Sequence, residues 1–316
     1  MADKRIAIGV DVGGTETKAG IVDESGTILV RAERPTDIHA GTKGILGIAE
    51  ELLGSASERR IEVSCIGIGA AGFINAETGA ATFAPNLVYD DPKIAAAVRV
   101  ATDLPVALDN DANAAAWGER RFGRAKGSDH LAFLTIGTGI GSGFVVEGRL
   151  VRGRTGAAAE FGHTIVELDG PQCPCGLRGC LEQLASGPAI ARLARDAVVE
   201  DPSSSILAFA SSAEQITAED VARAARQYDE TARAVLRQAG SALGVGLSNV
   251  VNIFDPEVIV LGGSVVKAGE PFLGPARDRL AAMTTAQRRR PMRLDVSTLA
   301  DAGIVGAAAL AFDEAS

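Results

Sequence analysis

The sequence predicts an α/β protein with two similar lobes, each built on a mixed β-sheet. Short β-rich runs joined by tight turns open the chain, and strands that alternate with helical stretches follow them, a pattern typical of a mixed sheet. The order of strand, glycine turn, strand and second turn occurs near residue 5 and again near residue 131. Such internal similarity indicates a duplicated domain.

The individual elements follow from apolar runs and helical spacing. In the first copy, strands are expected over residues 5–11, 19–22, 27–31, 63–68 and 104–108. A helix is expected over residues 43–59, and helical stretches lie on both sides of the last of these strands. In the second copy, strands are expected over residues 131–135, 143–146 and 150–151. A helical region over residues 187–250 and one more strand over residues 255–263 follow.

We expect the two lobes to meet near residues 110–120. Residues 1–112 would then form a small N-terminal lobe and residues 113–302 a large lobe. A C-terminal helix over residues 303–316 is expected to pack back on the small lobe. The natural place for a ligand is the cleft between duplicated halves.

The composition excludes several classes of protein. The 316 residues are 47% hydrophobic and 22% charged, so a large core can be buried and disorder is not expected. A net charge of −9 argues against a nucleic-acid-binding surface, which needs Lys and Arg to displace counterions. No signal peptide precedes the first strand, and no apolar run is long enough to span a bilayer. A cytoplasmic protein without a membrane partner is therefore expected.

Two glycine-rich turns have the residue types that bind phosphate. The first contains an acid, two glycines and a threonine: Asp11, Gly13, Gly14 and Thr15. Glycine lets backbone N–H groups approach a phosphate, the hydroxyl can donate, and the carboxylate can hold a water or Mg²⁺. Alone, this turn could equally be a glycine hairpin with an acid at its edge. A second glycine turn, over residues 137–141, repeats the arrangement and favours a pair of phosphate-binding loops.

Three polar residues, Asp109, Asn110 and Asp111, lie between a predicted strand and a helix expected to begin near Ala114. Asp and Asn are preferred N-caps, and one of the three is expected to cap this helix. One helix does not need three such residues, and a carboxylate at the mouth of a cleft could take the proton from an attacking hydroxyl. Both interpretations stay open on the residues alone.

Three cysteines and one histidine give the sharpest signal. Cys173, Cys175 and Cys180 follow a C-x-C-x4-C spacing, and His163 precedes them by ten residues. Three thiolates and an imidazole make a closed tetrahedral set for Zn²⁺. A chance cluster of reduced thiols and a redox pair are the alternatives, although redox pairs usually have a C-x-x-C spacing, which is absent. Since a closed set leaves no open position, the zinc is expected to be structural.

With these motifs in this order, the chain resembles the ROK family (repressors, open reading frames and kinases). Within that family it is similar to the bacterial ATP-dependent glucokinases, especially those of actinobacteria. The resemblance covers essentially the whole chain and rests on residues 11–18, 135–143, 160–163 and 173–182. It implies an actin-like, hexokinase-type (ribonuclease H-like) fold. It also implies transfer of the γ-phosphoryl group of ATP to glucose, with Mg²⁺ and a structural Zn²⁺.

The resemblance further implies roles for particular residues, with Asp111 as the catalytic base. The sugar would be bound by Asn86, Asn110, Asp111, Glu160, His163 and Glu182, with the backbone near Gly72 as a weaker candidate. The nucleotide would be bound by Asp11, Gly13, Gly14, Thr15, Lys18, Thr138, Gly139, Gly262 and Gly263. Zinc would be bound by His163, Cys173, Cys175 and Cys180. A departure is Ala159, where many family members have Gly before the sugar-binding Glu; this change can alter the loop but removes no polar group.

Plainer interpretations of these residues exist. Glu182 could be an ordinary acid in the first turn of a helix, Glu160 a solvated charge, and His163 a ligand of zinc alone. Alternative substrates are N-acetylmannosamine, N-acetylglucosamine, fructose or allose, and polyphosphate is an alternative donor. A sugar-sensing repressor of this family would carry a DNA-binding module ahead of the first phosphate loop, where ten residues precede Asp11. The resemblance also implies a homodimer or a homotetramer.

Overall fold

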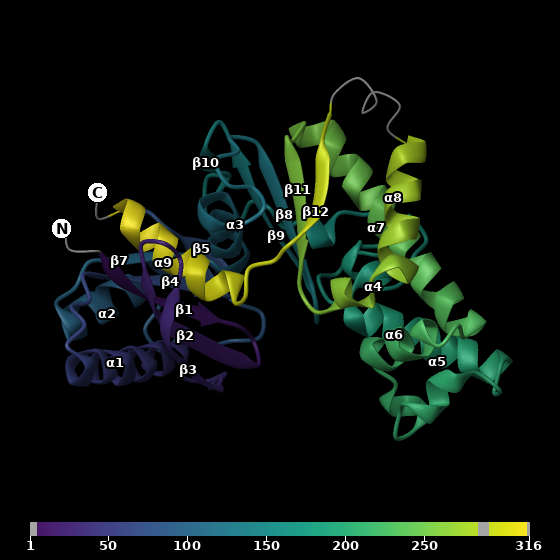
Figure 1. Ribbon diagram of the computed structural model, residues 1–316, viewed down its shortest axis with the longest axis horizontal. Coiled ribbons are helices and arrows are strands. Elements are labelled where there is room, and N and C mark those ends of the chain that lie inside the picture. The colour runs from purple at the N-terminus through teal and green to yellow at the C-terminus, as the bar shows by residue number, and fades with distance from the viewer. Residues whose placement is uncertain (1–4, 284–290, 315–316) are drawn as a thin grey trace. The chain divides into compact units, whose positions relative to one another are not determined.

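The computed structural model describes residues 5–283 and 291–314, and Figure 1 shows their helices and strands. The described residues divide into two compact units. The first unit takes its residues from Met1–Phe133, Gly143–Ala159 and Ser297–Ser316, and the second from Leu134–Ser142 and Glu160–Val296. This partition differs from the expected lobes, and a lobe boundary between residues 112 and 113 stays a prediction.

The first unit is built on a five-stranded mixed sheet with the strand order β3-β2-β1-β4-β7. Its strands are β1 (Ile6–Val12), β2 (Glu16–Asp23), β3 (Ile28–Pro35), β4 (Cys65–Ala70) and β7 (Val106–Asn110). The first three strands pair antiparallel, whereas β4 pairs parallel with both β1 and β7. The mixed sheet that the sequence predicts for this part of the chain is therefore confirmed.

Helices cover both faces of this sheet. On one face, α1 (Gly41–Arg59) and α2 (Ile94–Thr102) contribute buried apolar side chains at helical spacing to the core. On the other face lies α9 (Ala302–Glu314), which approaches β1 and β4 closely. A Cβ at Gly67 would lie 1.7 Å from Ala307 O, and a Cβ at Gly9 2.0 Å from Ile304 O. These two strand positions must therefore be glycine. Residues 315 and 316 of the expected C-terminal helix lie outside the described residues.

A second five-stranded sheet has the order β10-β9-β8-β11-β12. Its strands are β8 (Leu131–Ile136), β9 (Ile140–Val146), β10 (Arg149–Leu150), β11 (Val258–Gly262) and β12 (Arg293–Val296). In both sheets, the first three strands run in chain order from the centre to one edge, and the next two complete the other side. The repeated strand order agrees with the expected duplication.

Helices dominate the second unit (Figure 1). The α-helices are α4 (Glu182–Ala185), α5 (Gly187–Glu200), α6 (Ala218–Arg226), α7 (Glu230–Phe254) and α8 (Glu270–Met283). Short 3₁₀ helices are η1 (Phe161–His163), η2 (Ser205–Ala208), η3 (Ala213–Gln215) and η4 (Val265–Ala268). The start of α6 is defined by a capping box between Thr217 and Asp220, and Asp229 caps α7.

The structure contains elements that the sequence did not predict. A two-stranded hairpin of β5 (Phe73–Asn75) and β6 (Ala80–Phe83) lies in the first unit, and β12 adds an edge strand beside β11. Helix α3 (Asp111–Phe122) begins at Asp111 and not near Ala114, because Asn110 caps it. Among the described helices, none combines the length and the apolar character that crossing a membrane requires.

Candidate active site

The turn between β1 and β2 carries the first group of predicted phosphate-binding residues. Gly13 N–H donates to Glu16 O at 3.1 Å, and Gly14 and Thr15 are exposed at the tip. Asp11 pairs with Lys18 across the hairpin. Lys18 Nζ lies 3.0 Å from the Glu16 carboxylate. Asp11 therefore lies where the turn begins, and Gly14 and the Thr15 hydroxyl lie at its tip.

Two residues that the sequence analysis did not single out hold this turn and its acid. The Thr36 hydroxyl donates to Gly13 O at 2.8 Å, and the Thr36 N–H donates to Thr15 O at 3.0 Å. At the start of α9, a Cβ at Gly303 would lie 2.1 Å from Asp11 Oδ2. The first turn of α9 therefore packs directly on the Asp11 carboxylate. An unremarkable Gly in an Ala-rich run is not a recognisable signal for such a contact.

Asn110 takes the capping role that the sequence assigned to one of three residues. Its Oδ1 accepts the N–H groups of Ala112 and Asn113, as an N-cap does. Its Nδ2 donates to Gly72 O at 3.1 Å, which ties the cap to the backbone near the weaker sugar-site candidate. Asp111 Oδ1 accepts the same Ala112 N–H at 2.9 Å, so the side chains of Asn110 and Asp111 together hold the first turn of the helix.

Asp111 lies at the first position of α3, close to Asp11 and Tyr89. Burial raises the pKa of Asp111. Burial and the negative charge of Asp111 together raise the pKa of Asp11 to about 7, against a smaller opposing effect of Lys18. Burial and the same charge raise the pKa of Tyr89. A buried carboxylate with a raised pKa has the properties of a general base.

Tyr89 was not predicted, whereas its neighbour Asn86 was. Asn86 is exposed on the loop between β6 and α2. Three residues later, the Tyr89 hydroxyl donates to Ala71 O at 2.8 Å, and its ring lies against the position of Gly41. A Tyr at the end of a loop gives no sequence signal of its nearness to Asp111, because that nearness depends on the fold.

The turn between β8 and β9 is the second glycine turn. Gly137 N–H donates to Gly139 O at 2.9 Å, and Gly137 O accepts the N–H of Gly187 at the start of α5 at 2.8 Å. The Glu182 carboxylate accepts the N–H of Ile140 at 2.9 Å. A Cβ at Gly139 would lie 2.6 Å from the same Glu182 oxygen. Glu182 therefore holds this turn, and Gly139 leaves the room that this contact needs.

A pocket of about 590 Å³ opens beside this turn within the second unit. Its lining comes from the β8–β9 turn, from α5 and α6, and from the segment after β11, and includes Thr138, Pro188, Ala218, Ser264 and Lys267. Gly262 ends β11, and Gly263 follows with φ +90, where a Cβ would lie 2.2 Å from Ile136 O. The two predicted glycines thus lead directly into the lining segment. The α6 part of the lining was not predicted.

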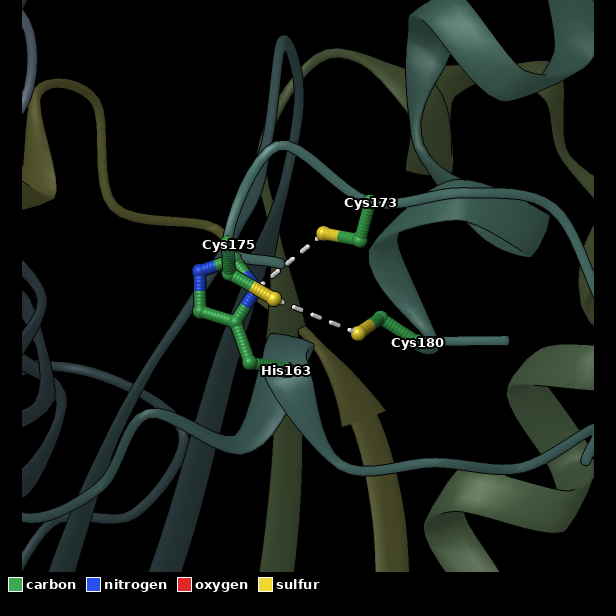
Figure 2. Close-up of side chains that lie close together, drawn as sticks. All are labelled: His163, Cys173, Cys175 and Cys180. Atoms are coloured by element: carbon green, nitrogen blue, oxygen red, sulfur yellow. Dashed lines mark hydrogen bonds between the residues drawn. The ribbon is translucent and has the colours of Figure 1, made fainter. Parts of the chain in front are cut away.

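Figure 2 shows the side chains of His163, Cys173, Cys175 and Cys180 turned toward one another. Each offers one ligand atom, and the four atoms lie within 4.8 Å of one another. The Cys173 thiol is 3.6 Å from His163 Nδ1, and the Cys175 and Cys180 sulfurs are 3.7 Å apart. A tetrahedral ion with Zn–S bonds of ~2.3 Å needs ligand atoms ~3.8 Å apart. The donor set therefore fits a closed zinc site.

Glu160 precedes the short helix η1, and His163 is its last residue. The Glu160 carboxylate lies 4.0 Å from His163 Nε2, whereas Nδ1 of the same ring faces the thiols. The Phe161 N–H donates to Ser142 Oγ at 3.2 Å and anchors the segment. Ala159, the residue before Glu160, has φ +70, in the left-handed region that favours glycine. The departure from Gly at this position therefore strains the backbone next to Glu160.

The sequence model of the ROK family matches residues 7–314. The chain belongs to the ROK family. This ROK protein is 38% identical over 305 residues to the glucokinase of Thermotoga maritima, a match that covers 96% of each chain. It is also 32% identical over 240 residues to the xylose repressor of Caldicellulosiruptor bescii, covering 76% of this chain and 60% of the repressor.

Among solved structures, the ROK protein is similar to a ROK family glucokinase from Streptomyces griseus in complex with glucose and AMPPNP. The TM-score is 0.85 at 39% identity, and the match covers 98% of this chain and 99% of that one. This likeness and the two mixed sheets confirm the expected fold class.

Proposed function

We propose that this ROK protein is an ATP-dependent glucokinase, which transfers the γ-phosphoryl group of ATP to glucose and forms glucose 6-phosphate. The observation that carries the proposal is the arrangement of Asp111: a half-buried carboxylate with a raised pKa, at the start of a helix and next to a glycine turn with its own acid. The likeness to glucokinases over almost the whole chain supports it.

Phosphoryl transfer needs positioning and neutralisation of charge more than covalent chemistry by the protein. Asp111 would orient the hydroxymethyl oxygen of the sugar and accept its proton as that oxygen attacks the γ-phosphorus. The ionised carboxylate is the active form. Burial makes it a stronger base than an exposed Asp, and the cap at Asn110 holds the first turn of α3 that carries it.

The residues proposed to bind ATP belong to the two glycine turns and to the segment after β11. On the first unit, the phosphate-binding residues would be Asp11, Gly13, Gly14, Thr15 and Lys18. On the second unit, Thr138 and Gly139 would bind phosphate, and the pocket after Gly262 and Gly263 would take the base and ribose. Mg²⁺, when bound, neutralises charge on the phosphates. Asp11 fits a role in holding it, because burial and Asp111 disfavour its ionised form and a cation would relieve this.

The hydroxyl groups of glucose both donate and accept hydrogen bonds, so carboxylates and amides are suitable partners. The proposed partners are Asn86, Asn110 and Asp111 on the first unit, and Glu160, His163 and Glu182 on the second. Zn²⁺ would be held by His163, Cys173, Cys175 and Cys180. With four protein ligands it would stabilise the fold and orient the His163 ring, with no part in the chemistry.

We further propose that the protein acts in the cytoplasm as a homodimer or homotetramer. None of the four cysteines forms a disulfide, and three of them form the proposed zinc set, a use of cysteine that is typical of a reducing compartment. The oligomeric state rests on the family resemblance alone, and analytical ultracentrifugation of the purified protein would measure it.

A substrate panel tests the proposed function. The purified protein is assayed with ATP or polyphosphate and with glucose, N-acetylmannosamine, N-acetylglucosamine, fructose or allose, and the product is identified by mass spectrometry. We expect the highest kcat/KM for ATP with glucose, and a kcat lowered by roughly 10²–10⁴ in the Asp111→Asn protein. A higher kcat/KM for another hexose would identify that hexose as the substrate in place of glucose. A higher kcat/KM for polyphosphate would identify it as the donor in place of ATP. Sugar binding without turnover of any hexose would favour a sugar-sensing regulator.

A further inference from the structure

Asp109 is a buried acid next to the proposed base, and the proposed function gives it no role. It is 1% exposed, and both of its carboxylate oxygens are hydrogen-bonded. Oδ1 accepts the N–H of Asn110 at 2.8 Å and Nδ2 of Asn113 at 2.9 Å. Oδ2 accepts Nε of Arg152 at 2.6 Å, from a residue 43 positions away along the chain. Asp109 therefore connects the end of β7, the first turn of α3 and the loop after β10.

The bonds to Asp109 determine the geometry of the turn that carries the base. The Asn110 N–H is oriented by Asp109, and the Asn110 side chain caps the helix that begins with Asp111. Asn113 is 3% exposed, and its Oδ1 finds no hydrogen-bond partner in residues 5–283 and 291–314. The bond from its Nδ2 to Asp109 therefore orients this amide. Loss of the Asp109 carboxylate would therefore loosen Asn110 and Asn113, which lie on either side of Asp111.

Arg152 is the cationic partner of the buried Asp109 carboxylate. A buried carboxylate without its partner is strongly unfavourable, and a guanidinium is the strongest available donor to it. The same residue begins a tight loop, closed by the Ala158 N–H, which donates to Arg152 O at 3.3 Å. Two residues after this closure the chain reaches Glu160, the proposed sugar-binding acid. The Arg152–Asp109 ion pair thus connects the start of the loop that leads to Glu160 with the turn that carries Asp111.

We propose that Arg152 is a positioning residue for the proposed base: through Asp109, it fixes the Asn110–Asp111 turn in the orientation that phosphoryl transfer needs. The inference rests on the proposed function. Arg152 itself is 40% exposed and lines a surface pocket of about 450 Å³ with Trp117 and Arg149. Since its side chain fills little of the core, its removal acts mainly through Asp109 and not through lost packing.

The test is a set of four variants in the full-length, zinc-loaded protein: Arg152→Met, Arg152→Lys, Asp109→Asn and the double variant. We expect Arg152→Met to lower kcat by about 10- to 100-fold, the size of effect that small misplacements of reacting groups produce. The KM values for ATP and glucose should stay within about threefold. Arg152→Lys should recover part of kcat. In the Asp109→Asn background, where the buried charge is gone, adding Arg152→Met should change kcat less than twofold.

Arg149→Met is the matched control, because Arg149 is exposed, lies three residues away and lines the same pocket. It should keep the kcat of the parent. Hydrogen exchange supplies a readout that does not depend on activity: the amides of Ala112 and Asn113 should exchange faster in Arg152→Met and unchanged in Arg149→Met.

The inference is overturned if folded Arg152→Met keeps kcat within twofold of the parent, or if it raises only the KM for glucose. It is also overturned if Arg152→Met lowers kcat by the same factor in the Asp109→Asn background as in the parent. If Arg152→Met does not fold, the comparison of Asp109→Asn with the double variant and the Arg152→Lys result decide in its place. Failure of the parent to phosphorylate any hexose would instead remove the proposed function, while the exchange rates would still report whether Arg152 holds the turn.

Discussion

Burial, together with the negative charge of Asp111 at the start of α3, raises the pKa of Asp11 near the end of β1 to about 7. Two acids that disfavour each other's ionised form are a costly arrangement in an empty site. The arrangement becomes favourable where a cation and a phosphate ligand neutralise one acid and the other serves as a base. The pair of Asp11 and Asp111 therefore destabilises the protein when no ligand is bound, and it suits the reaction proposed for the site.

Asp11→Asn should stabilise the protein at high pH when nucleotide and Mg²⁺ are absent. The pKa of Asp11 is about 7 in the folded protein against 3.8 in an unperturbed Asp, so the fold favours the protonated form. The free energy of unfolding therefore falls as pH rises from about 4 to about 7. The gain from Asn should be small at pH 4.5 and largest above pH 7, up to about 4 kcal/mol at ~1.4 kcal/mol for each pKa unit.

Thermal unfolding of both proteins at pH 4.5 and pH 8 measures this gain. Asp278→Asn, at an exposed position of α8, is the control and should show no such pH dependence. An equal difference in Tm at both pH values would contradict the coupling. The same Asp11→Asn protein should use ATP poorly, with a rise in the KM for ATP that exceeds any change for glucose.

Asp111→Asn should reduce kcat by roughly 10²–10⁴, the contribution that general-base catalysis commonly makes. An amide of the same size can still occupy the first position of α3, so the capping by Asn110 and the fold should persist. The Kd for glucose, measured by calorimetry, should stay close to that of the parent. A folded Asp111→Asn protein with near-normal kcat would remove Asp111 from the role of base.

Much of the fold was predictable, because most strands are short apolar runs bounded by turns. Every residue of β4 is buried, and its sequence is apolar throughout. The hairpin of β5 and β6 was missed because strands of three and four residues, with Ile74 as their one buried residue, leave no pattern. The strand β12 contains Arg293 and Asp295 and is defined by its pairing with β11, which sequence periodicity does not report.

One part of the candidate site was predictable from the sequence, and another part was not. The zinc cluster was predictable because three of its four ligands lie within eight residues and the thiol is a chemically specific group. The environment of Asp111 was not, because Tyr89, Gly303 and Arg152 reach it or its neighbours only through the tertiary fold. Glu182 was predicted as a sugar ligand, which stays a prediction, and no motif indicates its bond to the Ile140 N–H.

Purified protein should contain about one zinc per chain, and Cys175→Ser should lose it. Cys175 is exposed, so the substitution leaves no cavity, and a fall in Tm would report the lost metal and not lost packing. Cys65→Ala, at a buried thiol in β4, should keep the metal. Elemental analysis by mass spectrometry decides, and a fully active parent without zinc would refute the site.

Ala159→Gly should stabilise the protein slightly. A non-glycine residue in the left-handed region costs about 1–2 kcal/mol, and the extra freedom of glycine in the unfolded chain takes back about 0.4–1 kcal/mol. The net gain should therefore be about 0.5–1 kcal/mol in urea unfolding. Ala159→Val should instead destabilise, since a β-branched residue tolerates this conformation less well. Equal stability of all three proteins would show that the backbone here relaxes freely.

His163→Cys should keep zinc and lose sugar affinity, because we propose that the imidazole binds zinc through one nitrogen and a sugar hydroxyl through the other. Its Nδ1 faces the thiol of Cys173, and its Nε2 lies on the side of the Glu160 carboxylate. A metal-bound His usually donates its other N–H to an acceptor, and a sugar hydroxyl beside Glu160 would provide one. Zinc would then fix both the tautomer and the ring orientation, so that chelation should raise the glucose KM before the protein unfolds. A fourth thiolate can complete a Cys₄ zinc site but leaves nothing in place of Nε2. The measurements are zinc content and glucose affinity of the same preparation, with Cys175→Ser as the variant that loses the metal. If His163→Cys bound both zinc and glucose as the parent does, the imidazole would be a ligand of zinc alone.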